Sequence, residues 1–246
     1  AVWDSTFFLL AGKMYAIFSI LFGLSFFIQH DNQAQKGVDF RPRFVWRMFI
    51  LMLLGIFDLL FYNGDILFIY AVCGLLIIPL VRASDKVIWI FIALMLIQPV
   101  ELIYLIKGMI DPSAMPMDLG SCKYYGAIMV SQSQGNILDV AIAGLKYGLP
   151  ANFLWAVENG RMTQNVLFFL IGIMLGRKRL FYNEGNNLKI WKKILIGSLI
   201  AFAILLPLYK ILPGLSEARC VSNSLSVALN MWKNLAMMFF YVAGIT

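Results

Sequence analysis

Long apolar segments alternate with short polar ones along almost the whole chain. Each apolar segment approaches the ~20 residues that a helix needs to cross a bilayer core of ~30 Å. We predict spanning helices at 6–28, 44–62, 65–81, 87–106, 162–181, 190–212 and 224–244. The pattern therefore predicts an all-α fold, a polytopic transmembrane helix bundle with about seven spanning helices.

Residues 107–161 interrupt this pattern, because they are too polar for us to expect a span and too long for a turn. Asn136 is a good helix N-cap, so a short helix is predicted from there to about Gly148, with Pro150 ending it. Two interpretations stay open: the helix lies on the outer membrane surface, or it covers an outward-facing site. We treat 1–246 as one multi-pass membrane domain with an extracytoplasmic insertion at about 107–161.

Basic residues are concentrated in three of the polar loops, which hold 12 of the 20 Lys and Arg: those at about 36–47, 82–86 and 177–193. Loops rich in Lys and Arg stay on the cytoplasmic side. Residue 1 is then predicted to lie outside, and the last helix to end inside. An odd number of spans with an outer start leads us to expect at least one helix before residue 1, so the chain is expected to be a fragment.

Composition supports the membrane class. The chain is 61% hydrophobic and 13% charged, with a mean hydropathy of +0.81. Soluble domains are about 45–50% apolar and roughly 25% charged, which excludes an ordinary soluble globule. The net charge of +7 is then explained by orientation in the membrane, and no nucleic-acid partner is expected.

A few ionisable residues fall at membrane depth, mostly in the predicted outer half: Lys13, Asp58, Asp65, Glu101 and, nearer the middle, Lys233. Such groups are costly in a bilayer and usually pair or line a cavity. Lys13 with Asp58 or Asp65 is the natural pairing. The alternatives are an ion pair that only ties helices together, and, for Asp65, a helix cap.

Other residues carry weaker signals. Arg47 is predicted at the inner end of its helix, as an interfacial anchor or a phosphate ligand. Gly172 and Gly176 are spaced for a close helix–helix contact. Cys122 and Cys220 both fall in predicted outer loops, where they form a disulfide or stay as separate thiols. With one histidine and no metal-ligand spacing, no metal site is predicted.

Two stretches carry a resemblance to a known family: GKMYAIFSILFGLSFFIQ at 12–29 and RMFILMLLGIFDLLFYNGDILFIYAVCG at 47–74. They resemble the YeiB-type family of bacterial inner-membrane proteins. That family typically has a Lys before an F-x-x-LFG run, then an Arg, a helix ending G-x-x-H, and GDIL-x-x-YA. Its positions are matched by Lys13, Phe22-Gly23, Arg47, Gly55, Gly64-Asp65-Ile66-Leu67 and Tyr70-Ala71.

The resemblance is specific over 12–74, weaker at 164–177 and fades beyond. The family's histidine is replaced here by Asp58, and the first family helix with its loop is absent from this chain.

The family is grouped with a broad superfamily of transmembrane acyltransferases. The resemblance therefore implies transfer of an acyl group, in the inner (plasma) membrane, from a cytoplasmic thioester to an extracytoplasmic glycan or lipid. The donor would be acetyl-CoA or another acyl-CoA, and no bound cofactor is expected. The catalytic candidates are Asp58, Asp65 and Lys13, and the substrate-binding candidates are Glu101, Tyr70 and Arg47.

Two other functions stay open from the residues. Membrane-embedded acids also suit a small-solute transporter or exporter. The 107–161 segment also suits a non-catalytic membrane protein whose outer loop binds a partner. The sequence does not decide whether the protein is an enzyme.

Overall fold

The computed structural model describes residues 13–182 and 186–246, and these form helices and turns with no strand among them. They divide into two compact units. Unit 1 contains the described residues up to Asn32 together with Ala83–Pro116 and Leu167–Thr246. Unit 2 contains Gln33–Arg82 and Met117–Val166. Each unit is described separately.

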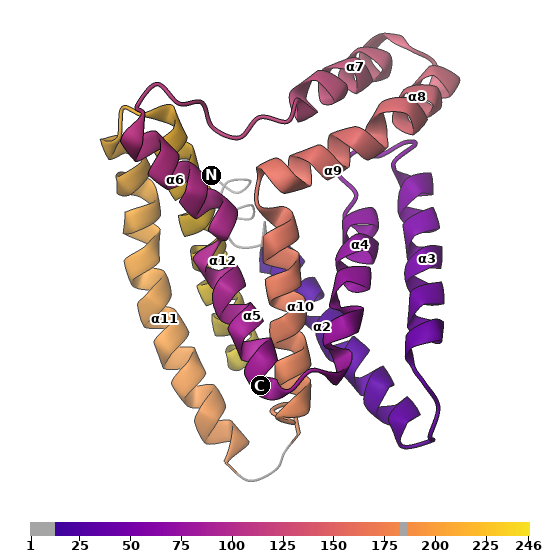
Figure 1. Cartoon of the computed structure of the whole chain (residues 1–246), viewed down its shortest axis with the longest axis vertical. Helices are drawn as coiled ribbons and strands as arrows, with labels where there is room; N and C mark the ends of the chain where they lie inside the picture. The colour runs from indigo at the N-terminus through magenta and orange to yellow at the C-terminus, as the bar shows by residue number, and fades with distance from the viewer. Residues whose placement is uncertain (1–12, 183–185) are drawn as a thin grey trace. The chain divides into compact units, whose positions relative to one another are not determined.

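Unit 1 is built around two long helices that lie side by side (Figure 1). These are α11 (Asn187–Ile211) and α12 (Arg219–Ile245), joined through the 3-10 turn η3 (Leu212–Leu215). Helix α6 (Pro99–Ile110) follows α5 (Asp85–Ile97) and packs against α12. The unit also holds most of α2 (Lys13–Ala34) and most of α10 (Arg161–Arg177).

Unit 2 is a helical hairpin with a second group of helices from the insertion. The hairpin consists of α3 (Arg41–Asp58) and α4 (Leu67–Ile77), and α4 continues as the 3-10 turn η1 (Ile78–Arg82). A Cβ on Gly55 would meet the backbone of Phe68, so the absence of a side chain lets α3 and α4 approach closely. The insertion forms α7 (Ser121–Gln134), α8 (Ile137–Ala143), the π segment η2 (Gly144–Gly148) and α9 (Leu149–Glu158).

Four helical segments among the described residues are long and apolar enough to cross a membrane: Lys13–Ala34, Asp85–Ile110, Ile137–Glu158 and Asn187–Leu215. This supports the membrane class predicted from composition. The count of seven spanning helices is not confirmed, because these four candidates do not include the spans predicted at 44–62, 65–81, 162–181 and 224–244. Residues 6–12 of the first predicted helix lie outside the described residues.

The insertion differs from its prediction in two ways. Asn136 caps α8 as expected, with its side chain accepting from the backbone N–H of Leu138 and Asp139. The helix does not end at Pro150, however, but continues through η2 and α9 to Glu158. Proline is tolerated in the first turn of a helix, and the π segment directly before it re-forms the helix start there. Ile137–Glu158 thereby becomes long and apolar enough to span, contrary to the polarity expected of 107–161.

Close contact between α2 and α10 confirms the role predicted for the glycine pair of α10. A Cβ on Gly172 would collide with the backbone carbonyl of Ile20, and one on Gly176 would meet the Phe27 ring at 2.5 Å. On the opposite side, a Cβ on Gly23 would collide with the carbonyl of Phe169. The two backbones therefore touch only because both helices place glycines at the contact.

This contact predicts that Gly172→Ala destabilises the protein. The added methyl group must push apart two helix backbones, and overpacking of this kind costs about 1–3 kcal/mol of unfolding free energy. Gly197→Ala in α11 is the matched control, because a Cβ there has open space around it. Thermal unfolding of both variants in detergent measures the difference, and an unchanged midpoint for Gly172→Ala would contradict the tight contact.

Candidate functional site

The turn between α3 and α4 is where the sequence places its acids Asp58 and Asp65. The last turn of α3 tightens, with the Leu59 N–H donating to the Gly55 carbonyl and the Tyr62 N–H donating to the Asp58 carbonyl. Leu59 is only 1% exposed, so this turn is packed against other parts of unit 2. The packing of this turn therefore fixes the positions of Asp58 and Asp65 on either side of it.

The insertion supplies those surroundings. A Cβ on Gly144 would lie about 2.5 Å from the carbonyl oxygens of Leu59 and Leu60, and one on Gly148 would lie 3.2 Å from the Leu59 carbonyl. Both glycines belong to the π segment η2. The backbone of the insertion thus rests on the backbone of the α3–α4 turn, at a point where the helix geometry is locally widened.

Polar contacts complete this packing. The Asn152 side chain of α9 donates through Nδ2 to the Asp65 carbonyl at 2.8 Å. Asp65 Oδ1 accepts from the Leu67 N–H at 3.1 Å, although Asp65 stands one residue before the N-cap of α4, which is Ile66. Tyr125 of α7 donates its hydroxyl to the Asn63 carbonyl at 3.4 Å. Burial and, to a smaller degree, the Glu158 carboxylate raise the pKa of Tyr125, so the phenol stays protonated as a donor.

Three buried oxygens at this turn have no hydrogen-bond partner: Asn63 Oδ1, Asp65 Oδ2 and Asn152 Oδ1. We call these three residues the turn cluster. The orientation of the Asn152 amide is fixed, because only its NH₂ group can donate to the Asp65 carbonyl. All three unsatisfied atoms are therefore acceptors, and buried acceptors without donors are rare in native proteins.

The chemistry of the turn cluster follows from this. Asp65 and Asn152 are 7% and 4% exposed, so solvent screens them weakly. Asp58 ends α3 close enough to Asp65 for the two carboxyl groups to interact electrostatically. The arrangement offers acceptor oxygens to hydroxyl or ammonium donors and provides carboxylates that can take up a proton.

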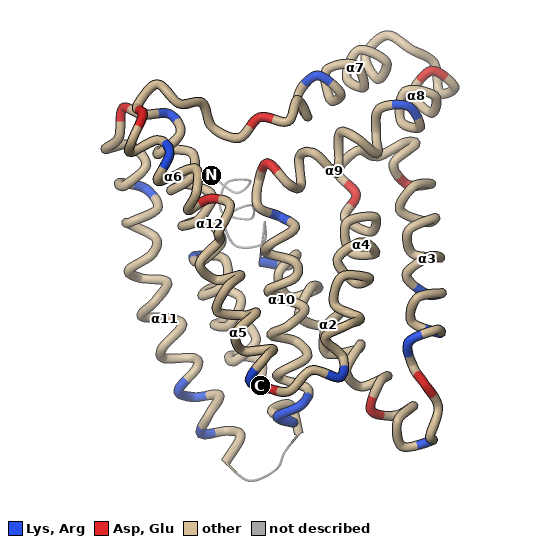
Figure 2. Tube along the Cα trace, in the orientation of Figure 1, with Lys and Arg blue, Asp and Glu red and all other residues tan. Residues whose placement is uncertain are grey.

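Of the residues predicted for a site, Asp58, Asp65 and Tyr70 lie on the α3–α4 hairpin of unit 2. Tyr70 is buried in α4. Arg47 lies on the same helix as Asp58 but roughly 16 Å from it along the axis, from the 1.5 Å rise per residue. Figure 2 shows this separation of charge along α3, with basic positions at its start and an acid at its end.

The other predicted residues lie in unit 1. Lys13 and Lys233 are buried there and interact electrostatically with each other. The Lys233 ammonium lies 3.8 Å from the centre of the Tyr209 ring, so α11 provides it with a cation–π contact. Glu101 is buried in the first turn of α6. The pairing of Lys13 with Asp58 or Asp65 stays a prediction, as does a substrate-binding role for Glu101.

The predicted outer cysteines belong to different units. Cys122 is exposed at the start of α7, whereas Cys220 is buried and its thiol donates to the Tyr104 carbonyl at 3.1 Å. Both are free thiols, as is Cys73. The disulfide between Cys122 and Cys220 stays a prediction.

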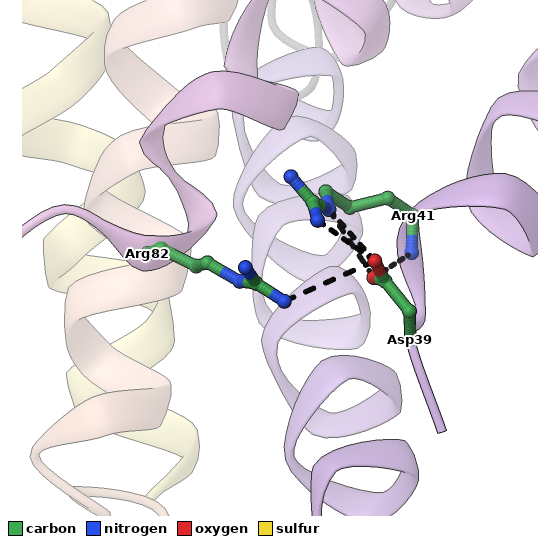
Figure 3. A network of polar contacts seen from close by, with 3 residues as sticks. All are labelled: Asp39, Arg41 and Arg82. Atoms are coloured by element: carbon green, nitrogen blue, oxygen red, sulfur yellow. Dashed lines mark hydrogen bonds and ion pairs between the residues drawn. The ribbon is translucent and has the colours of Figure 1, made fainter. Parts of the chain in front are cut away.

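The start of α3 carries a separate polar network (Figure 3). Asp39 pairs with Arg41 at 2.8 Å and with Arg82, at the end of η1, at 3.8 Å. Hydrogen bonds from Arg41 lower the pKa of Asp39 from 3.8 to about 2. This network joins both ends of the hairpin on the side that the positive-inside rule assigns to the cytoplasm.

Sequence reasoning missed Asn63, Tyr125 and Asn152. Asn63 lies in the same turn as the two acids, but asparagine is common in turns, so its presence there did not indicate a functional role. Asn152 is an isolated amide in the apolar run LPANFLWA. That run was assigned to the segment after Pro150, outside the predicted helix, which hid its role.

Comparison with known proteins finds similarity only to proteins without an assigned function. Residues 175–246 match the family described as "Protein of unknown function (DUF418)". The chain is 32% identical over 81 residues to an uncharacterized 39.9 kDa protein in the amylase 3′ region of Bacillus acidopullulyticus. It is 22% identical over 205 residues to the uncharacterized protein YxaH of Bacillus subtilis (strain 168).

These alignments cover 33% and 78% of this chain, and 23% and 50% of the two relatives. The chain thus spans at most about half the length of the curated relatives it matches. No solved structure matches it. The family match is consistent with the YeiB-type resemblance, although it falls beyond the residues in which that resemblance is strongest.

The turn cluster predicts that Asn152→Ala destabilises unit 2. The substitution leaves the Asp65 carbonyl without its buried donor, which costs about 1–3 kcal/mol of unfolding free energy. Asn159→Ala removes a similar side-chain bond, to the Trp155 carbonyl, at an exposed position and serves as the control. Thermal unfolding should separate the two variants, and equal midpoints would contradict the role of Asn152.

The Asp39 network predicts a dependence of stability on pH. Because the folded-state pKa of Asp39 is lowered, its stabilising contribution is complete above the ordinary pKa of 3.8 and is lost as pH falls toward about 2. Asp39→Asn should therefore flatten the fall of the unfolding midpoint in that window. Glu217→Gln, an exposed acid without an ion pair in the described residues, is the control. An unchanged pH profile for Asp39→Asn would contradict the prediction.

Proposed function

We propose that this chain is the membrane-embedded part of an acyltransferase of the bacterial inner (plasma) membrane. Seven crossing segments would place the turn cluster on the extracytoplasmic side. The acceptor is a hydroxyl-bearing envelope glycan or lipid, and the donor is acetyl-CoA or another acyl-CoA. The observation that carries the proposal is the set of unsatisfied acceptor oxygens beside two carboxyl groups.

The acceptor binds at the turn cluster through its hydroxyl groups. A sugar hydroxyl is both a donor and a nucleophile, and Asn63 Oδ1 and Asn152 Oδ1 are acceptors that lack donors. Hydrogen bonds from two hydroxyls would satisfy both amide oxygens and orient the sugar. Asp65 Oδ2 would then accept from the hydroxyl that reacts.

The reaction itself needs a base. The acceptor oxygen attacks the thioester carbonyl, a C–O bond forms, the C–S bond breaks, and the donor leaves as a thiolate. The hydroxyl proton passes to the carboxylate, which is Asp65 or Asp58. The family resemblance places a histidine where Asp58 stands, and a carboxylate can also act as a general base.

The donor is proposed to bind on the opposite side. Acyl-CoA donors carry phosphate groups, which arginine binds well through paired N–H groups. Arg47 is exposed on α3, and it lies near the start of that helix together with Arg43. Arg43 also donates to Gln33 Oε1 at 3.3 Å. Arg43 and Arg47, which stand one turn apart on the same helix, are the candidates for the phosphates.

The proposal predicts acyl transfer that depends on the acids. The full-length protein in lipid nanodiscs is incubated with labelled acetyl-CoA and a panel of envelope glycans. We expect labelled ester in the wild type and a loss of at least about 100-fold for Asp65→Asn, because a general base contributes roughly 10²–10⁴-fold. Asp58→Asn tests the alternative base in the same assay.

Two controls make the outcome interpretable. Asp118→Asn changes an exposed acid of unit 2 that accepts a hydrogen bond from the Gly120 N–H. The amide oxygen of asparagine can accept the same bond, so acyl transfer should be retained. Arg47→Gln should raise the KM for the donor without changing the KM for the glycan. Folded wild-type protein that neither binds the donor nor forms ester would overturn the proposal.

A further inference from the structure

The membrane-span candidate Asp85–Ile110 of unit 1 is broken in its interior. Gln98 stands between α5 and α6 with φ 53° and ψ 71°, the left-handed conformation that non-glycine residues rarely adopt. Pro99 follows as the first residue of α6 and has no N–H to donate. Ile110 ends this segment, so the break lies well inside the apolar stretch rather than at its end.

Two hydrogen bonds to α12 hold the break together. The Trp232 indole donates to the Leu96 carbonyl at 2.9 Å, and the Gln98 amide donates through Nε2 to the Ala228 carbonyl at 3.1 Å. Because only an NH₂ group can donate to that carbonyl, the orientation of the Gln98 amide is fixed. Its oxygen, Oε1, then faces away from this bond and has no partner, although Gln98 is 0% exposed.

Glu101 brings a second unsatisfied oxygen to the same helix start. It is 7% exposed, and its Oε2 has no hydrogen-bond partner. Gln98 is the N-cap of α6 and Glu101 is the third residue of that helix, two positions whose side chains lie close to each other at a helix start. Apart from its own backbone N–H, nothing in the described part of the chain bonds to or pairs with this carboxyl group.

A carboxylate in these surroundings needs a positive partner. An ionised acid in an apolar interior is strongly disfavoured unless it is paired. Two nearby titratable groups have other partners: the Lys233 ammonium of α12 lies over the Tyr209 ring, and the Cys220 thiol donates to the Tyr104 carbonyl. The other titratable groups of these helices make no electrostatic interaction with the Glu101 carboxyl group: Tyr104 and Lys107 of α6, Arg219 and Tyr241 of α12, and Asp85 and Lys86 of α5.

We propose that the break in Asp85–Ile110 is a monovalent cation site, at which Glu101 Oε2 and Gln98 Oε1 hold a proton or a sodium ion. Both unsatisfied atoms are oxygens, and oxygens bind hard cations and can also share a proton. One carboxylate balances one positive charge and leaves a divalent ion uncompensated. Discontinuous membrane helices supply ion sites of this kind.

The cation site lies deep within the apolar segment Asp85–Ile110. Glu101 lies roughly 14 Å from the Ile110 end of the segment, from the helical rise, and farther from the Asp85 end. A cation that binds there has entered the apolar region. The site is separate from the turn cluster, because Gln98 and Glu101 belong to unit 1 whereas Asn63, Asp65 and Asn152 belong to unit 2.

The experiment measures the occupant directly. The full-length protein in lipid nanodiscs is studied in sodium chloride and in choline chloride at equal ionic strength. Infrared spectroscopy at neutral pH detects the carbonyl band of a protonated carboxylic acid, and thermal unfolding detects cation binding through a rise of the midpoint with concentration. Wild type, Glu101→Gln and the control Glu217→Gln are compared.

Each outcome decides the proposal. A protonated-acid band that is insensitive to sodium and lost in Glu101→Gln identifies a proton. A midpoint that rises with sodium in the wild type and in Glu217→Gln, but not in Glu101→Gln, identifies sodium. The proposal is overturned if the wild type shows no protonated-acid band and no sodium-dependent midpoint. It is also overturned if the band survives in Glu101→Gln.

A second variant, Glu101→Asp, keeps the proposal testable if Glu101→Gln does not fold. Glu101→Asp retains the carboxyl group but moves it back by one methylene. The acid band should then shift rather than vanish, and the effect of sodium on the midpoint should weaken. A spectrum and a midpoint identical to those of the wild type would mean that residue 101 does not hold the cation.

Discussion

A hydrogen-bonding group that is taken out of water must find a partner, and this constraint governs the interior of both units. Where partners exist, they tie helices together. In unit 1 the indole of Trp232 and the amide of Gln98 bind carbonyls across the contact of α12 with α5 and α6. In unit 2 the Asn152 amide binds the Asp65 carbonyl and fixes α9 over the hairpin turn. These bonds are worth more in apolar surroundings, because water does not compete for the same groups.

The same constraint makes the exceptions informative. Among the residues that the structure describes, five buried side-chain oxygens without a partner lie at two places: the turn cluster of unit 2 and the helix break of unit 1. Every one of them is an acceptor. A stable fold would be expected to supply donors to such atoms, so a hydroxyl-bearing substrate at one place and a cation at the other are consistent explanations.

Glycine provides the geometry on which these polar contacts depend. Gly144 and Gly148 let the π segment of the insertion rest on the α3–α4 turn, and without that approach Asn152 would not reach Asp65. Gly23 and Gly172 do the same for α2 and α10. In apolar surroundings the hydrophobic effect does not drive helices together, so close packing through small residues has to do so.

The sequence by itself determined the class and most of the helices. Apolar runs of near-spanning length set the positions of α3, α4, α10, α11 and α12, because a long apolar segment has few alternatives to a helix in a bilayer. The cap by Asn136 and the one-turn spacing of Gly172 and Gly176 also followed from local rules, whereas the helix that the glycine pair contacts, α2, did not. Local sequence likewise placed Asp65 near a helix start, although it is not the N-cap of α4.

Only the tertiary structure decided which polar groups are left without partners. Asn152 is 87 residues from Asp65, and Gln98 is 130 residues from Ala228, so no local pattern could connect them. The continuation of the helix through Pro150 and the left-handed break at Gln98 likewise depend on packing against other segments, which overrides local preference. The sequence could place acids at membrane depth, but whether an acid has a partner is a property of the folded neighbours around it.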